Sequence, residues 1–206
     1  MKKYDCMRMM LCGLDWLFRK ILSLYGRLQF FIICFLWGVK LARGGMFIGR
    51  VVVRNTREGR IRLGRGCVLQ ASFRMNPIGP ASPCLLDVRP GGEIEIGDGT
   101  GMTSTIVSSA QKISIGRCCK IGGGAKILDH NFHAMNADDR KIGKGDAKPR
   151  EVLIGDDVFI GTNAIILKGS KIGDRSVIAA GSVVFGLDVP PDSLVRGNPA
   201  VIVARK

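Results

Sequence analysis

The stretch that decides the fold is residues 154–184, IGDDVFIGTNAIILKGSKIGDRSVIAAGSVV. Aliphatic side chains recur in it at every sixth position without a slip. A helix would place sixth neighbours about 240° apart around its axis, and one long strand would be too extended to stay compact. A chain that turns a corner every six residues buries them all. The members of this series are Ile154, Ile160, Ile166, Ile172, Ile178 and Val184.

The same period returns upstream, at Ile115, Ile121 and Ile127, at Ile96 and Met102, and at Leu63 and Leu69. Glycine often directly follows the aliphatic residue, and small residues recur four places after that aliphatic residue. Three six-residue faces form an 18-residue triangular coil, and stacked coils build parallel sheets around an aliphatic interior. We therefore expect a mainly β protein, with a parallel β-helix over residues 46–206.

The register breaks once within its regular part. Between Ile127 and Ile154 lie 27 positions, which is not a multiple of six. A polar segment, residues 129–150, must therefore leave the three-sided column of stacked coils, the prism, as a protruding loop. This loop contains both histidines of the chain, His130 and His133.

Composition narrows the classes of function. A formal charge of +14 favours polyanionic partners, which include nucleic acid, an anionic membrane and phosphate-bearing substrates. Only 6% of residues are aromatic, and no basic block is interleaved with them, so nucleic acid is disfavoured. The seven cysteines form no C-x-x-C pair, which disfavours both a disulfide framework and structural zinc.

Residues 1–45 form a separate, basic and apolar segment, with eight Lys/Arg against two Asp. Apolar residues recur in it at helical spacing up to Leu28, and Leu28–Val39 is then apolar on all sides. Twelve such residues rise about 18 Å as a helix, which is short for a membrane span. We expect a helix that lies on a membrane surface or packs on the protein or a sister subunit; a true span is the remaining alternative.

The loop histidines are the candidate catalytic groups. Acyl transfer to a hydroxyl needs a base that titrates near the working pH, and histidine meets this need. The competing interpretation is that both are surface side chains. A zinc site at His130, His133 and Asp129 would need a further nitrogen ligand, and no third histidine exists, so we expect no metal.

Residues 94–206 resemble the hexapeptide-repeat sugar O-acetyltransferases, the group that includes maltose, galactoside and exopolysaccharide acetyltransferases. The resemblance is carried by His133 with Arg140 seven places later, by the runs at 154–161 and 177–184, and by the closing Gly197-Asn198-Pro199-Ala200. It implies a left-handed β-helix, acetyl-CoA as co-substrate and a homotrimer with active sites between prisms.

The resemblance also implies roles for particular residues. The general base would be His133, with His130 as the alternative and Asp129 orienting the imidazole.

Relatives hold the pantetheine arm at positions that correspond to Gly161, Thr162, Ala179 and Ala180. The basic residue that commonly follows G-N-P-A is replaced by Val201 here, which leaves Lys168, Arg205 and Lys206 to hold the phosphates. Ser104 stands where relatives use an acceptor-binding asparagine, and Arg140 is a second acceptor-binding candidate.

We therefore expect an O-acetyltransferase that modifies a sugar or lipid-linked saccharide in exopolysaccharide, capsule or lipopolysaccharide synthesis. It would be cytoplasmic, at the inner face of the cytoplasmic membrane. An N-acetyltransferase of an amino sugar on the same fold and a non-catalytic scaffold are the alternatives.

Overall fold

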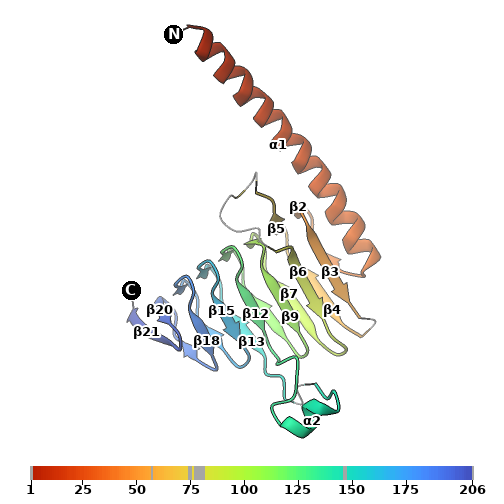
Figure 1. The fold of residues 1–206 in the computed structure, drawn as a ribbon, viewed down its shortest axis with the longest axis vertical. Helices are drawn as coiled ribbons and strands as arrows, with labels where there is room; N and C mark the ends of the chain where they lie inside the picture. The colour runs from red at the N-terminus through yellow and green to blue at the C-terminus, as the bar shows by residue number, and fades with distance from the viewer. Residues whose placement is uncertain (1, 57, 74–75, 77–81, 146–147, 206) are drawn as a thin grey trace.

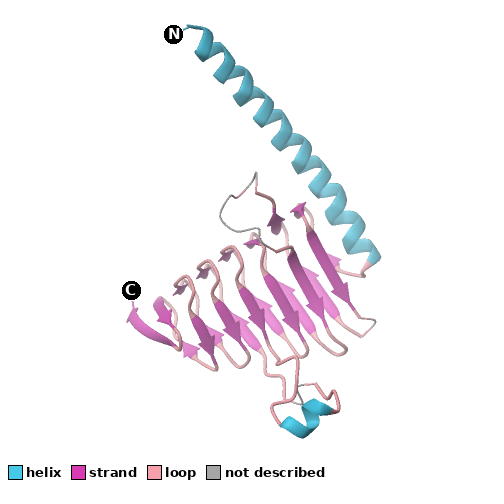
Figure 2. Ribbon diagram, viewed as in Figure 1, coloured by secondary structure: helices cyan, strands magenta, loops and turns pink. Residues whose placement is uncertain are grey.

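The computed structural model describes residues 2–205 apart from residues 57, 74–75, 77–81 and 146–147. One long helix, α1 (Lys2–Leu36), leads into a left-handed parallel β-helix that accounts for most of the chain (Figure 1). Short strands on three faces alternate with turns, and the only other helix of the described residues is α2 (Ala137–Lys141) (Figure 2). The mainly β, parallel β-helical fold expected from the sixfold period is thus confirmed, and so is the left-handed winding that the family resemblance implies.

The strands form three parallel sheets, which we call A, B and C. Successive strands of the chain visit the sheets in that order, so neighbours within a sheet lie one coil apart. The final strand, β21, is the exception, because it pairs antiparallel with β20. Sheet A holds β1 (Lys40–Leu41), β4 (Arg60–Leu63), β7 (Glu93–Ile96), β10 (Ile113–Ile115), β13 (Val152–Ile154), β16 (Lys171–Ile172) and β19 (Asp188–Val189). Sheet B holds β2 (Met46–Gly49), β5 (Val68–Ala71), β8 (Gly101–Thr103), β11 (Lys120–Ile121), β14 (Phe159–Ile160), β17 (Val177–Ile178), β20 (Ser193–Gly197) and β21 (Ala200–Arg205). Sheet C holds β3 (Val51–Asn55), β6 (Cys84–Val88), β9 (Ile106–Ser109), β12 (Lys126–Leu128), β15 (Ile165–Leu167) and β18 (Val183–Phe185).

The aliphatic series fills the interior of this column. Ile154 is in register with Ile115 on one side and Ile172 on the other, and Ile160 is in register with Ile121 and Ile178. All six members of the series from 154 to 184 are buried. Each coil therefore contributes one aliphatic side chain per face to a continuous core, which supplies most of the folding free energy.

Glycine occupies corners where consecutive coils approach most closely. A Cβ atom added to Gly97 would lie 2.6 Å from the carbonyl carbon of Gly116 in the next coil, a separation that real Cβ atoms do not show. The glycine that follows the buried aliphatic residue thus permits coil spacing as tight as the strand pairing requires.

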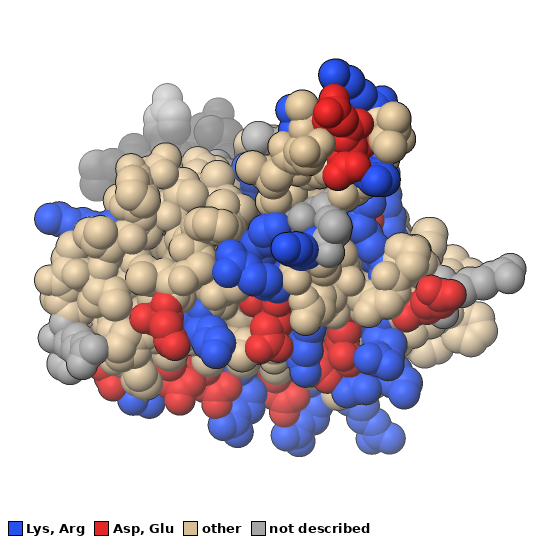
Figure 3. All heavy atoms as spheres, turned by 90° about the horizontal axis from the view of Figure 1, so that it is seen from below, with Lys and Arg blue, Asp and Glu red and all other residues tan. Residues whose placement is uncertain are grey.

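Ion pairs join consecutive coils along the corner between sheets A and B. Arg65 pairs with Asp98, and Arg117 pairs with Asp156 at 2.6 Å. Each carboxylate also accepts a hydrogen bond from the backbone N–H of its arginine. Acidic and basic side chains consequently alternate along one side of the column (Figure 3).

Two connections between consecutive strands are long. Residues 129–151 connect β12 to β13 and contain α2, whose first turn is capped by the Asn136 side chain. Residues 72–83 connect β5 to β6, and most of them lie outside the described residues. The sequence predicts only the first of these connections, because the six-residue series upstream of Ile96 is too fragmentary to reveal a break.

The C-terminal half of α1 packs on β2. The rings of Phe30 and Phe47 meet edge to face at 4.6 Å, and Gly26 allows the helix to approach the backbone of Phe47. The rest of α1 projects well beyond the coils (Figure 1). Large apolar side chains there are exposed, Trp16 by 58%. Among the described residues, no helix has the length and apolar character that crossing a membrane requires.

Candidate functional site

The excursion begins with a buried acid and imidazole pair. Asp129 and His130 follow β12 directly, and Nδ1 of His130 lies 3.0 Å from Oδ1 of Asp129. Their side chains are 0% and 3% exposed. A backbone hydrogen bond from Arg150 to the carbonyl of Asp129 closes the base of the excursion. The pair is therefore fixed where the loop leaves the column.

Asp129 is held in its ionised form by the end of the preceding coil. Burial raises the pKa of this carboxyl, but hydrogen bonds from His130, the Ser109 hydroxyl and the N–H groups of Ala110 and Gln111 outweigh burial, so that its net pKa is lowered. The last three donors lie 2.7–2.9 Å from the carboxylate oxygens. A carboxylate fixed in this way orients the imidazole and favours the tautomer with its proton on Nδ1.

The second nitrogen of His130 has no protein partner. Nε2 is buried, and none of the described residues offers it a hydrogen bond. The ring of Phe132 lies beside the imidazole, with centroids 4.8 Å apart. A buried polar atom without a partner is uncommon in native proteins and points to an unfilled contact.

His133 has a different environment. Its side chain is exposed, and the described residues provide no hydrogen bond to it. Asp129 therefore lies against His130, three residues before the histidine that the family resemblance favours. Arg140 braces the excursion, because its guanidinium donates to the carbonyls of Ala134 and Met135.

A groove of about 430 Å³ lies on the outer face of sheet C, beside this pair. Arg54, Asp87 and Ser108 are in register across β3, β6 and β9 and provide its polar floor. Phe132 forms part of its wall, which links the groove to His130. Sequence reasoning missed this groove, because outward-facing positions have no period of their own.

Beyond β12 the outer face of sheet C becomes apolar. Leu167 and Phe185 continue across β15 and β18 the row that begins at Arg54. Arg150, from the end of the excursion, places its guanidinium 5.4 Å from the centre of the Phe185 ring. His130 therefore stands where a polar half and an apolar half of one surface meet.

The residues expected to bind the pantetheine arm cluster at one corner. Gly161 and Thr162 follow β14, and Ala179 and Ala180 follow β17 one coil later. A Cβ atom at Gly161 would collide with the backbone nitrogen of Ala180, so the two corners are in close contact. This is the corner between sheets B and C, at the opposite edge of sheet C from His130.

The two basic residues expected near the phosphates lie apart from that corner. Lys168 follows β15 at the corner between sheets C and A, and its ammonium group donates to the carbonyl of Lys148. The backbone of Arg205 ends β21, and its side chain lies outside the described part of the chain.

Within one chain, the fold does not place Ser104 near His130 or His133. It is buried at the turn before β9, whereas Asp129 contacts the residues after β9. Its hydroxyl is also without a partner among the described residues. Any contact of Ser104 with the acceptor would therefore need another chain or a large substrate.

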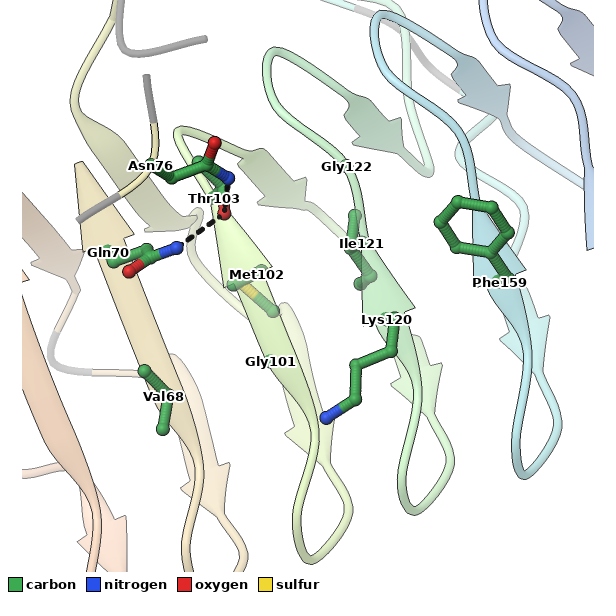
Figure 4. Close-up of a pocket in the computed structure, with 10 residues that line it drawn as sticks. All are labelled: Val68, Gln70, Asn76, Gly101, Met102, Thr103, Lys120, Ile121, Gly122 and Phe159. Atoms are coloured by element: carbon green, nitrogen blue, oxygen red, sulfur yellow. Dashed lines mark hydrogen bonds between the residues drawn. The ribbon is translucent and has the colours of Figure 1, made fainter. Parts of the chain in front are cut away.

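A second groove, of about 330 Å³, lies on the outer face of sheet B (Figure 4). The amide groups of Gln70 and Asn76 both donate to the Thr103 hydroxyl at one end of it. Lys120 extends toward Gly101, and Phe159 stands on the strand beyond. This surface contains no histidine and is on a different face from the Asp129 and His130 pair.

Within the described residues, no group of three or more His, Cys, Asp or Glu side chains is placed to hold a metal ion.

Comparison with known proteins places these observations in a family context. Residues 151–186 match the family described as bacterial transferase hexapeptide (six repeats). YvoF of Bacillus subtilis strain 168, which is named as a provisional acetyltransferase, is 43% identical over 96 residues, or 47% of this chain and 49% of YvoF. A 2,3,4,5-tetrahydropyridine-2,6-dicarboxylate N-acetyltransferase of Clostridium perfringens is 59% identical over 51 residues, or 25% of this chain and 21% of that enzyme. This chain thus spans about half the length of the first relative and a fifth of the second.

Solved structures show the same fold. The hexapeptide-repeat acetyltransferase VCA0836 of Vibrio cholerae aligns with 37% identity and a TM-score of 0.50, over 54% of this chain and 62% of that one. AntD, an N-acyltransferase from Bacillus cereus solved with dTDP and 3-hydroxybutyryl-CoA, aligns with 16% identity and a TM-score of 0.58, over 82% and 85%. The hexapeptide-repeat resemblance seen in the sequence is confirmed.

Proposed function

We propose that this hexapeptide-repeat protein transfers an acetyl group from acetyl-CoA to a hydroxyl group of a saccharide. The observation that carries the proposal is the Asp129 and His130 pair, at the junction between the polar and apolar halves of sheet C. The named acetyltransferases among its relatives support the donor. The polar groove suits a hydroxyl-rich acceptor.

The proposed base is His130. Asp129 holds the proton of the imidazole on Nδ1, so Nε2 is free to accept the proton of the acceptor hydroxyl. The hydroxyl oxygen then bonds to the acetyl carbon, the carbon–sulfur bond breaks, and His130 returns the proton to the departing thiolate. Phe132 would have to turn aside for the hydroxyl to reach Nε2.

The donor would lie along the C-terminal coils. The apolar outer face at Leu167 and Phe185 would take the pantetheine arm, and the corner at Gly161, Thr162, Ala179 and Ala180 would supply backbone contacts. Lys168 and Arg205 are the proposed partners of its phosphates. Exposed apolar surface on this face would also suit a neighbouring chain, in line with the homotrimer implied by the family resemblance.

The first test separates the two histidines. His130→Ala should lower turnover about 10²-fold or more in a thiol-release assay with acetyl-CoA and a panel of sugars, while His133→Ala retains most of it. Circular dichroism and the thermal midpoint would establish that both variants fold. Loss of turnover in His133→Ala alone would move the base to His133. Retention in both would overturn catalysis by a loop histidine.

A second candidate function is N-acetylation of an amino sugar or related amine. The observation that favours it is the 59% identity with a dicarboxylate N-acetyltransferase over 51 residues. Parallel assays on matched amino and hydroxyl acceptors would decide between the two, because the pair at Asp129 and His130 could serve either nucleophile.

We further propose that α1 binds the cytoplasmic face of a membrane, where a lipid-linked saccharide would be presented. Its exposed side chains are largely apolar, and Lys20 and Arg27 lie among them. Sedimentation with phosphatidylglycerol vesicles should deplete the full chain from solution, and Leu24→Asp should weaken the binding at least tenfold. Equal recovery with anionic and neutral vesicles would count against the charge contribution.

A further inference from the structure

The groove on sheet C contains two arginines that form no ion pair with a carboxylate in the described part of the chain. Arg54 projects from β3, and Arg89 follows β6. Neither forms an ion pair or side-chain hydrogen bond with any described residue. The guanidinium of Arg89 instead lies 4.9 Å from the centre of the Phe132 ring. Stacking of this kind leaves the N–H groups at the edge of the guanidinium free to donate.

Five arginines on sheet A and at the corner between sheets A and B have a different environment. The A face and the corner between sheets A and B pair theirs with carboxylates, most often from the next coil. Arg54 has such a carboxylate in register, Asp87, but Asp87 accepts the Ser108 hydroxyl at 2.7 Å instead. The lining therefore combines the positive charges of Arg54 and Arg89 with the single carboxylate of Asp87, which leaves the groove net positive.

The rest of the groove has the chemistry of a sugar site. Trp37 contributes an aromatic side chain to the lining, and the Asn55 amide donates to its backbone carbonyl. Asp87 can accept hydrogen bonds from sugar hydroxyls. Two further polar atoms of the lining, the Asn55 amide oxygen and the Thr56 hydroxyl, are buried without a partner among the described residues.

We infer that the acceptor is a phosphorylated saccharide whose phosphate is bound by Arg54 and Arg89. This inference rests on the proposed acetyl transfer and specifies its acceptor class. Arginine is suited to phosphate because its planar fork donates two parallel hydrogen bonds. The sugar would lie between Trp37 and Asp87, with a hydroxyl directed past Phe132 toward His130.

The phosphate could come from a sugar 1-phosphate, a sugar nucleotide or a polyprenyl diphosphate sugar. Trp37, in the lining of the groove, directly follows the exposed apolar end of α1, which contains Phe35 and Leu36. A lipid chain leaving the phosphate would find apolar surface there. Acetylation rates with the three acceptor types, each built on the same sugar, distinguish these sources.

The experiment compares each hexose with its own 1-phosphate at saturating acetyl-CoA, using thiol release. The phosphorylated sugar should have at least a tenfold higher kcat/KM. Arg54→Ala and Arg89→Ala should each remove about tenfold or more of that advantage, since a hydrogen bond between charged groups is worth about one such factor. Arg196→Ala is the matched control, because it removes an exposed arginine from β20, outside the groove.

A binding measurement keeps this inference separate from catalysis. Calorimetric titration with glucose 1-phosphate, with coenzyme A present at saturation, should show weaker binding in both groove variants and not in Arg196→Ala. If that pattern holds but no acceptor is acetylated, the proposed function fails and the phosphate site stands. The phosphate site is overturned if free hexoses react as well as their phosphates. It is also overturned if glucuronic acid, which has a carboxylate and no phosphate, is the only acceptor with a higher kcat/KM than the free hexose. A third contrary outcome is that the arginine variants raise only the KM for acetyl-CoA.

Discussion

Replacing Asp129 with asparagine should weaken both the fold and the proposed chemistry. The carboxylate accepts four hydrogen bonds, two at each oxygen: Ala110 N–H and His130 at Oδ1, and the Ser109 hydroxyl and Gln111 N–H at Oδ2. Asparagine keeps one oxygen, and its amide NH₂ then faces two donors. Two bonds to a charged group are worth about 3–6 kcal/mol together. In either orientation of the amide one of the two donors can accept instead, the Ser109 hydroxyl by turning or His130 by moving its ring proton, so we expect a loss of about 3 kcal/mol.

The expected loss of turnover has a separate cause. If the new NH₂ group faces His130, Nδ1 becomes the acceptor and the ring proton moves to Nε2. The imidazole then has no lone pair for the acceptor hydroxyl. We therefore expect turnover to fall by about 10²-fold or more.

Urea unfolding at pH 7 measures the free energy of unfolding, and thiol release measures turnover. Ser109→Ala is the control, because it removes one of the four donors and leaves the tautomer of His130 unchanged. It should cost about 1.5 kcal/mol and retain most turnover. An Asp129→Asn variant that loses less than about 1 kcal/mol, or keeps its turnover, would refute the reasoning.

The pH dependence gives a further check on the same residue. The pKa of Asp129 is lower in the folded chain than its ordinary value of 3.8. Between these two pKa values the unfolded chain binds more protons, so the stabilisation by Asp129 is complete above this window and is lost as the pH falls through it. Asp129→Asn should lack this contribution to acid unfolding.

Three other outcomes are expected. Gly97→Ala should lower the thermal midpoint by several degrees because its Cβ meets the next coil, whereas Gly13→Ala, with open space around it, should be neutral or stabilising. Ile160→Ala should cost about 2–5 kcal/mol in urea unfolding, because the side chain is fully buried in the aliphatic column. Mass spectrometry after brief alkylation should find Cys118 modified ahead of Cys34, since Cys118 is exposed while burial raises the pKa of Cys34 to about 12.

The interior of the column could be predicted from the sequence because each coil repeats one packing problem. Burial at every sixth position leaves a period that can be counted along the chain, and the break before Ile154 located the excursion by arithmetic alone. The position of Asp129 and His130 followed from the same break.

The outer surface could not be predicted in this way. Arg54 and Arg89 are 35 positions apart and line one groove because β3 pairs with β6 across a coil longer than the regular repeat. The choice between His130 and His133 likewise depends on which imidazole meets Asp129, and spacing in the sequence does not determine this. The roles implied for Lys168, Arg205 and Ser104 stay predictions.

The two ends of the column are covered by different elements, and this limits how copies of the protein can associate. At the first coil α1 covers β2, and at the last coil β21 turns back antiparallel along β20. An uncovered terminal coil would present backbone groups ready to pair with the first coil of another molecule. Because β21 already occupies that edge of sheet B, end-to-end polymerisation into a fibre is obstructed there, and association through the sides of the column is favoured instead.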